Sequence, residues 1–329
     1  MKTSLSLSRL AGASSFRSLK DRVRRYYDAN RFNWPIYDLF RYSFNREPKQ
    51  LYRSEGRIMQ SISLEQKVAR ELKQNGLSVV HFSDLLPAHQ FSELQELAEA
   101  LMQKPGIQER VKAIEAGARP GAKSGKFYLV RPMGDRPALD VNDKFLKVCL
   151  SDPILRIVCS YFGMFARLVD IELWYNVATD GSDVFSQRWH RDNEDRQIVK
   201  IFLYLRDVDH TNGPFCYIPR THNAGLYKRI FPQTIDRSVY PPDRAVEKKF
   251  ATIQKRVCVG KAGTLIFADT TGFHRGGHPT AGGRLLFHAY YATNACLPVV
   301  TSEKRYSIVR SDHRVVGSAA KYATSHVER

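Results

Sequence analysis

Three side chains that can bind a metal ion lie in two short stretches of the sequence. His190 and Asp192 are two residues apart in Arg-Trp-His-Arg-Asp, and His274 follows much later in Gly-Phe-His-Arg-Gly-Gly. Residues i and i+2 of an extended chain point to the same side, so the imidazole and the carboxylate can share one ion. Such a pair often occurs by chance. With a second histidine it forms the facial triad of two imidazoles and one carboxylate, which binds non-haem iron and leaves coordination positions open.

A fourth residue, Arg284, stands ten residues after His274, at the start of an expected strand. Its guanidinium can bind a carboxylate through two parallel hydrogen bonds. In a strand the side chains alternate between two faces, so Leu286, His288 and Tyr290 share the face of Arg284. If Arg284 points into a pocket, His288 is therefore expected to be buried beside the same pocket.

Other polar residues allow both a functional and a structural interpretation. His210 and His222 lie near expected turns and are interpreted as surface or structural groups. Lys126, Tyr128 and Trp174 are candidates for a substrate pocket, although such residues more commonly lie in a core or on a surface.

The elements that must position these residues are mostly short strands separated by turns such as Asn212-Gly-Pro. The predicted strands are residues 77–82, 127–130, 168–177, 198–205, 215–218, 264–268 and 285–292. Many short strands argue for a β-sandwich or barrel, and helices packed on its outside give an α+β fold class.

Helical patterns dominate the first part of the chain. Residues 18–27, 63–74 and 87–102 place apolar side chains at helical spacing. The basic, Gly-rich stretch 104–126 predicts a mobile loop. The basic connection 224–256 is interpreted either as a lid that recognises an anionic substrate or as a solvated surface loop.

In their order and spacing, His190, Asp192, His274 and Arg284 resemble the phytanoyl-CoA dioxygenase family. The supporting motifs are Trp-His-Arg-Asp, Asn-Gly-Pro-Phe and Ile-Pro, together with Gly-Thr-Leu-Ile-Phe-Ala-Asp ahead of the second histidine. The resemblance covers roughly residues 76–297 and does not include the first 75 residues.

The resemblance implies a double-stranded β-helix, a cupin-like jelly roll, with the metal inside. It implies Fe(II) as the metal, 2-oxoglutarate and O2 as co-substrates, and succinate and CO2 as products. Arg284 would bind the distal carboxylate of 2-oxoglutarate, and Asn176 is a weaker candidate for a contact with it. The family spacing to Arg284 favours His274 over His278 as the distal ligand. Asp192 argues for hydroxylation or desaturation, because related halogenases lack this carboxylate.

Two positions depart from the family pattern. Gly276 stands where many members have a Ser or Thr that helps to hold 2-oxoglutarate, so another group must replace it if any does. Arg220-Thr-His222 stands where the family often has Gly-Ser-His.

The composition is that of an ordinary globular protein, with 43% hydrophobic and 11% aromatic residues. The five cysteines are dispersed and form no CxxC pair. They predict free thiols in a reducing compartment, for which we expect the cytoplasm, and they argue against a structural zinc site. No stretch reaches the roughly 18–20 apolar residues that a membrane span requires.

The net charge is +18, of which residues 1–75 contribute +9 and residues 302–329 contribute +3. A basic surface favours nucleic acid, membrane headgroups or phosphorylated ligands, but basic termini that aid solubility are the simpler interpretation. Residues 1–20 resemble either an organelle transit peptide or a frayed bacterial N-terminus, and we prefer the second.

These observations divide the chain into a basic helical or irregular extension (1–75), an oxygenase domain (76–301) and a basic tail (302–329). The expected function is Fe(II)- and 2-oxoglutarate-dependent hydroxylation of a small molecule, with an anionic substrate as one option. The alternatives are a nucleic-acid-modifying oxygenase and a non-catalytic jelly-roll binding protein. The sequence contains no recognisable nucleic-acid-binding module, which argues against the nucleic-acid-modifying enzyme. A binding protein without catalytic activity does not require the triad and Arg284, and this argues against the second alternative. The substrate and the oligomeric state stay open.

Overall fold

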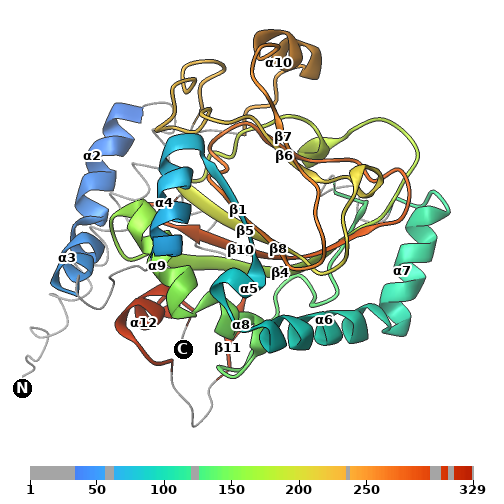
Figure 1. The fold of residues 1–329 in the computed structure, drawn as a ribbon, viewed down its shortest axis with the longest axis horizontal. Helices are drawn as coiled ribbons and strands as arrows, with labels where there is room; N and C mark the ends of the chain where they lie inside the picture. The colour runs from blue at the N-terminus through green and yellow to red at the C-terminus, as the bar shows by residue number, and fades with distance from the viewer. Residues whose placement is uncertain are drawn as a thin grey trace, which may run out of the picture.

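The computed structural model describes residues 34–55, 63–119, 126–234, 238–296, 305–309 and 315–327. In this part of the chain, helices surround one large antiparallel sheet (Figure 1). The expected mixture of helix and sheet is therefore confirmed. The expected helix at residues 18–27 and the interpretation of residues 1–20 lie outside the described residues.

The strands are β1 (Leu77–His81), β2 (Leu129–Val130), β3 (Ala138–Leu139), β4 (Arg167–Asn176), β5 (Ile198–Tyr204), β6 (Phe215–Tyr217), β7 (Arg256–Cys258), β8 (Thr264–Ala268), β9 (His274–Gly276), β10 (Arg284–Ala292) and β11 (Ser307–Ile308). The α-helices are α2 (Trp34–Phe44), α3 (Arg46–Ser54), α4 (Ser63–Asn75), α5 (Phe82–Leu85), α6 (Ala88–Met102), α7 (Pro105–Glu115), α8 (Lys144–Cys149), α9 (Asp152–Phe162), α10 (Asp243–Lys249) and α12 (Ser318–Thr324).

The large sheet has six strands in the order β1-β8-β5-β10-β4-β2, and every neighbouring pair is antiparallel. A second antiparallel sheet has the order β7-β6-β9. A short parallel pair, β11 with β3, lies apart from both sheets. The two longest strands, β4 and β10, pair along almost their whole length at the centre of the large sheet.

The two faces of β10 have different environments, as the alternation of its residues predicts. Leu285, Phe287, Ala289 and Tyr291 belong to the main hydrophobic core. This core also takes in the apolar faces of α4, α8 and α9, which cover one side of the large sheet (Figure 1). The other face of β10 carries Arg284, Leu286, His288 and Tyr290, and all four line a cavity.

The expectation of a mobile loop over residues 104–126 is wrong for residues 105–115, which form α7. Pro105 stands in the first turn of this helix, where a missing N–H costs nothing, and Val111 and Ile114 are buried against the core. Helices α8 and α9 were not expected from the sequence. Helix α9 is amphipathic: Asp152, Arg156 and Ser160 form one polar stripe, and the apolar residues on its other sides are buried. It ends at Gly163 with a left-handed φ of 67°.

The N-terminal helix α2 is anchored to the large sheet through one buried carboxylate. Tyr37 is 1% exposed, and its hydroxyl lies 3.1 Å from Asp195 Oδ1 and 3.0 Å from the carbonyl oxygen of Ala295. Arg41 Nε donates to the same Asp195 oxygen at 3.2 Å. The other oxygen of Asp195 accepts from the main-chain N–H of Thr293 at 3.0 Å, directly after β10. Asp195 therefore joins α2 to the end of the central strand.

The other end of the chain also packs onto this core. Ala320 and Ala323 of α12 are buried in the main hydrophobic cluster, and Tyr306 donates a hydrogen bond to the carbonyl oxygen of Leu168 at 2.9 Å. Among the described residues, the helices are too short or too polar for any of them to cross a lipid bilayer.

We expect Tyr37→Phe to lower the free energy of unfolding by about 1–2 kcal/mol, because the change removes a buried hydroxyl from a carboxylate. Urea unfolding measures this directly. Tyr42→Phe is the matched control on the same helix, since Tyr42 is 69% exposed, and it should change stability by less than about 0.5 kcal/mol. Equal effects of the two substitutions would contradict the docking of α2 through Tyr37.

Candidate active site

Two main-chain hydrogen bonds bring the two candidate histidines together. The N–H of His190 donates to the carbonyl oxygen of His274, and the N–H of His274 donates to that of His190, both at 3.0 Å. Two residues later, the N–H of Asp192 donates to the carbonyl oxygen of Thr270 at 3.0 Å. The segment before β5 is therefore fixed against the segment around β9, and both histidines face Asp192.

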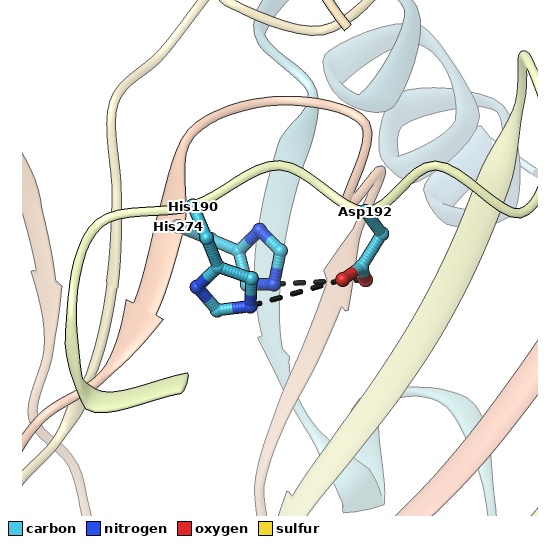
Figure 2. Close-up of side chains that lie close together, drawn as sticks. All are labelled: His190, Asp192 and His274. Carbon is cyan, nitrogen blue, oxygen red and sulfur yellow. Dashed lines mark ion pairs between the residues drawn. The ribbon is translucent and has the colours of Figure 1, made fainter. Parts of the chain in front are cut away.

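The side chains of this group form a compact set of three possible metal ligands (Figure 2). His190 Nε2 lies 3.7 Å from Asp192 Oδ1, and His274 Nε2 lies 3.7 Å from Asp192 Oδ2. All three residues are buried, with 4–6% of their surface exposed. Donor atoms at this separation can all reach one central ion at about 2.0–2.2 Å after small side-chain movements.

The second ring nitrogen of each histidine is held by the backbone. His190 Nδ1 lies 2.9 Å from the carbonyl oxygen of Arg188, and His274 Nδ1 lies 3.0 Å from that of Gly272. These contacts place the proton on Nδ1 and leave Nε2 as the free lone pair that a metal needs. Burial lowers the pKa of His274 to about 4 and the pKa of His190 well below its ordinary value, so both rings are neutral at pH 7.

Asp192 is ionised in spite of its burial. Burial acts to raise its pKa, but Lys200, together with the two histidines when low pH protonates them, outweighs this effect and holds the pKa below its usual range. Lys200 Nζ donates to Asp192 Oδ2 at 2.6 Å. The lysine therefore fixes the direction in which the carboxylate points.

Arg284 lies in the same cavity, with unmet hydrogen-bonding capacity. It is 4% exposed, and its Nε and Nη1 atoms have no partner among the described residues. Asn176, its register partner on β4, also has an amide nitrogen without such a partner. Unpartnered buried donors cost about 1–3 kcal/mol each, so the arrangement suits an anionic ligand that accepts from both side chains.

The departure at Gly276 has a structural reason. A Cβ atom at this position would lie 3.0 Å from Arg284 Nη2, so a larger residue would press on the guanidinium. The cavity wall also contains a hydroxyl pair, Tyr128 with Ser186, whose oxygens are 2.7 Å apart.

The cavity has a volume of about 240 Å³ and contains both the candidate metal ligands and Arg284. Its walls come from both sheets and from the long connection 224–256, where Tyr240 stacks on the His190 ring at 4.9 Å between centroids. Part of this connection therefore lies at the cavity, and a short helix, α10, forms another part of it.

Of the weaker sequence candidates, Lys126, Tyr128 and Trp174 all line the cavity. His278 does not line it and contacts Thr179 and Asp183 instead.

His222 is buried away from the cavity, with Nε2 3.1 Å from the carbonyl oxygen of Lys73. His210 lies in a surface turn.

Several residues in the cavity wall were not identified from the sequence, although the sequence pattern around most of them indicates a polar position. Asp170 and Glu172 alternate with apolar residues in β4, and Lys200 interrupts the apolar strand β5. A charged residue at period two in a buried strand indicates a polar inner face. Arg305 also lines the cavity, but it lies far along the chain and nothing in its sequence context indicates this.

Comparison with known protein families gives one match over most of the chain. The family model described as phytanoyl-CoA dioxygenase (PhyH) matches residues 72–284, which is 213 of 329 residues. Among curated protein sequences, no significant match is found.

Solved structures with similar folds include several iron and 2-oxoglutarate proteins. The epimerase SnoN in complex with Fe3+, alpha-ketoglutarate and nogalamycin RO is 16% identical with a TM-score of 0.49, over 70% of this chain and 84% of that one. EctD from S. alaskensis with 2-oxoglutarate and 5-hydroxyectoine is 18% identical with a TM-score of 0.48, over 70% and 76%. The carbocyclase SnoK from nogalamycin biosynthesis is 12% identical with a TM-score of 0.43, over 69% and 83%. At this level of similarity, the family match is the finding on which an assignment rests.

Gln233, in the connection 224–256, supports the main chain that carries Asp192. Gln233 Nε2 donates to the carbonyl oxygens of Asp192 and Asp195, both at 2.8 Å. We expect Gln233→Ala to weaken Mn(II) binding about tenfold, because the main chain that carries the ligand loses its support. Calorimetric titration measures the affinity. Gln74→Ala, on the exposed side of α4, is the control that should leave Mn(II) binding unchanged. Unaltered Mn(II) affinity in a folded Gln233→Ala protein would refute the role of Gln233.

Proposed function

The chain belongs to the phytanoyl-CoA dioxygenase family, and from this premise we propose that it hydroxylates a small molecule with release of succinate and CO2. Members of the family use Fe(II), 2-oxoglutarate and O2. One observation supports the proposal above all others. Three buried metal-ligand side chains and a buried arginine with unpartnered donors face one cavity.

In this proposal, His190, Asp192 and His274 hold the iron. The donor set fits the ion, since two neutral imidazoles and one carboxylate are the ligands of non-haem Fe(II) oxygenases. The backbone contacts of both Nδ1 atoms and the Lys200 ion pair fix the three donors before the metal binds. Bound Fe(II) and 2-oxoglutarate supply the activation of O2 and the oxidising power for attack on a C–H bond.

The residues around Arg284 would hold 2-oxoglutarate. Its guanidinium takes the distal carboxylate with two parallel hydrogen bonds, and Asn176 donates from the neighbouring strand. Tyr128 and Ser186 provide hydroxyl groups on the side where Gly276 has none. Arg284 is buried, and away from bulk water a charge-assisted pair is stronger than in water. Tyr240 covers one face of His190 and limits the access of water.

We further propose that the two sheets form a double-stranded β-helix around the cavity. The six-stranded and three-stranded sheets both contribute residues to its walls, and the His190–His274 bridge joins the segment before β5 to β9 of the three-stranded sheet. The oxygenase domain would span residues 76–301, and Tyr37 and Arg305, from the described parts of the two flanking segments, contact it.

Hydroxylation is the outcome that we favour among the reactions of this chemistry. The presence of Asp192 as a carboxylate ligand leaves no place for a halide, and a small cavity suits a small substrate. The reaction is tested by incubating the full chain with Fe(II), 2-oxoglutarate and O2 and measuring succinate. Gain of one oxygen atom by the substrate, seen by mass spectrometry, would identify hydroxylation. An isomer or a product with two fewer hydrogen atoms would contradict it.

We expect Arg284→Leu to weaken 2-oxoglutarate binding to the Mn(II)-loaded protein by about 100-fold or more, because it removes one partner of a buried charged pair. Mn(II) binding itself should persist, since Arg284 is not a metal ligand.

Arg275→Leu is the matched control for this prediction. Arg275 lies on β9 beside the cavity, but it pairs with Asp183 at 3.3 Å and lies over the Trp189 ring. We expect 2-oxoglutarate affinity to be unchanged in this variant. If the effects of the two substitutions were reversed, Arg275 would be the co-substrate residue and the assignment of Arg284 would be wrong.

A further inference from the structure

The cavity has a second polar region on β4 and β10, beyond the residues assigned to iron and 2-oxoglutarate. Asp170, Glu172 and Trp174 line the cavity from one strand, and His288 lines it from the other, directly opposite Glu172. Ligand atoms of Asp170, Glu172 and His288 all lie within 4.8 Å of one another, and all three residues are buried. None of them has a role in the chemistry described above.

The hydrogen bonds of the two carboxylates show which atoms are still free. Glu172 Oε1 accepts from Arg131 Nε at 2.7 Å, and Glu172 Oε2 accepts from Trp174 Nε1 at 2.8 Å. Asp170 Oδ2 accepts from Arg305 at 3.2 Å. Asp170 Oδ1 is buried and has no partner among the described residues. Of the four carboxylate oxygens, Asp170 Oδ1 therefore remains available to accept a hydrogen bond from a ligand.

His288 has more unused capacity than any other histidine in the cavity. It is 2% exposed, and neither ring nitrogen has a hydrogen-bond partner in the described part of the chain. Its Nδ1 lies 3.8 Å from Glu172 Oε2, which is too long for a hydrogen bond. The ring is fixed by stacking on Trp174, at 4.2 Å and 12°. A neutral imidazole held in this way offers one donor and one acceptor to a ligand.

A second metal ion does not suit this group, although three ligand residues lie together. Both oxygens of Glu172 are engaged, so only Asp170 Oδ1 and His288 remain for coordination. Arginines already balance the charge of both carboxylates. Two free donors are too few for a metal site in a protein, but they are sufficient to bind a polar group of an organic ligand.

Lys126 adds a positive charge on the same side of the cavity. Its ammonium lies 5.7 Å from the centroid of the Trp174 ring, and within the described residues it has no hydrogen bond or ion pair with a carboxylate. The other cations of this region differ, because Arg131, Lys200 and Arg305 are each paired with an acid. Lys126 is therefore available to an anionic group.

From this arrangement we infer that the cavity binds a small acid that also carries a hydrogen-bond donor, that is, an amino acid or a hydroxy acid. Its carboxylate lies against Lys126, and its amino or hydroxyl group donates to Asp170 Oδ1 or His288. The inference rests on the proposed function and names the substrate class for it. The cavity volume of about 240 Å³ has to hold 2-oxoglutarate as well, so the part of the substrate inside it is small.

The test uses the full chain with Fe(II), 2-oxoglutarate and O2, and measures the rate of succinate release. The compounds are the common L-amino acids and the 2-hydroxy acids with the same carbon skeletons. Two control sets carry one group each: carboxylic acids without the donor, and primary amines without the carboxylate. The assay is run at pH 8, because burial and the neighbouring Glu172 raise the pKa of Asp170 to about 7 and the free carboxylate is needed.

We expect at least one amino or hydroxy acid to increase succinate release strongly, and neither control set to do so. In Lys126→Gln, the concentration of this compound for half-maximal stimulation should rise about tenfold or more, since a charged hydrogen bond is lost. Lys112→Gln, exposed on α7, should not change that concentration. In Asp170→Asn, Arg305 holds the single amide oxygen and the NH2 group takes the place of Oδ1. An ammonium group cannot accept from this NH2 but a hydroxyl group can, so the change should weaken an amino acid far more than a hydroxy acid.

Two results would overturn the inference while leaving the proposed function intact. One is stimulation by the single-group compounds to the same extent. The other is stimulation by no compound of the panel, in a protein that binds 2-oxoglutarate in an Fe(II)-dependent manner. A protein that does not bind 2-oxoglutarate at all would instead remove the proposed function, and the inference with it.

Discussion

The pair of main-chain hydrogen bonds between His190 and His274 is the constraint on which the site depends. These residues come from distant parts of the chain, and each bond spans 3.0 Å. The bonds bring two imidazoles to one place, and the extended segment from His190 to Asp192 adds the carboxylate. Other contacts hold this arrangement in place. Main-chain carbonyl oxygens orient the two imidazole rings, and Lys200, on strand β5 of the large sheet, orients the carboxylate of Asp192.

This arrangement requires an unusual distribution of polar groups. The inner faces of β4, β5 and β10 carry charged side chains in a buried environment, where each unpartnered group costs about 1–3 kcal/mol. The opposite faces of the same strands pack on α4, α8 and α9 in the main hydrophobic core. The apolar faces of these strands therefore stabilise the sheet, and its polar faces are available for contacts with ligands. Such sites have the unused hydrogen-bonding capacity that ligand binding satisfies.

Much of the fold and site could be predicted because local patterns determine them. Alternation in β10 placed Arg284 and His288 on one face, and both line the cavity. The strands near residues 77, 168, 198, 264 and 285 follow from apolar runs between turn residues.

The failures have a common cause, which is dependence on contacts with distant residues. Helix α7 forms in a Gly-rich stretch because Val111 and Ile114 can be buried against the core. Arg305 reaches the cavity only because the chain after β10 returns to β4, where it pairs with Asp170. The Lys200–Asp192 pair likewise depends on how β5 lies relative to the segment before it. Local sequence does not encode these contacts, although a lone lysine in an apolar strand indicates a polar inner face.

The central claim is that His190, Asp192 and His274 together bind one metal ion. The most direct measurement is a titration of Mn(II) into the metal-free full chain, followed by calorimetry or by the spin-resonance signal of free Mn(II), for the unsubstituted protein and for His274→Ala and His278→Ala. We expect one Mn(II) per chain in the unsubstituted protein and in His278→Ala, and loss of this binding in a folded His274→Ala protein. Retention of Mn(II) binding by His274→Ala, or its loss in His278→Ala, would show that these three residues do not form the metal site.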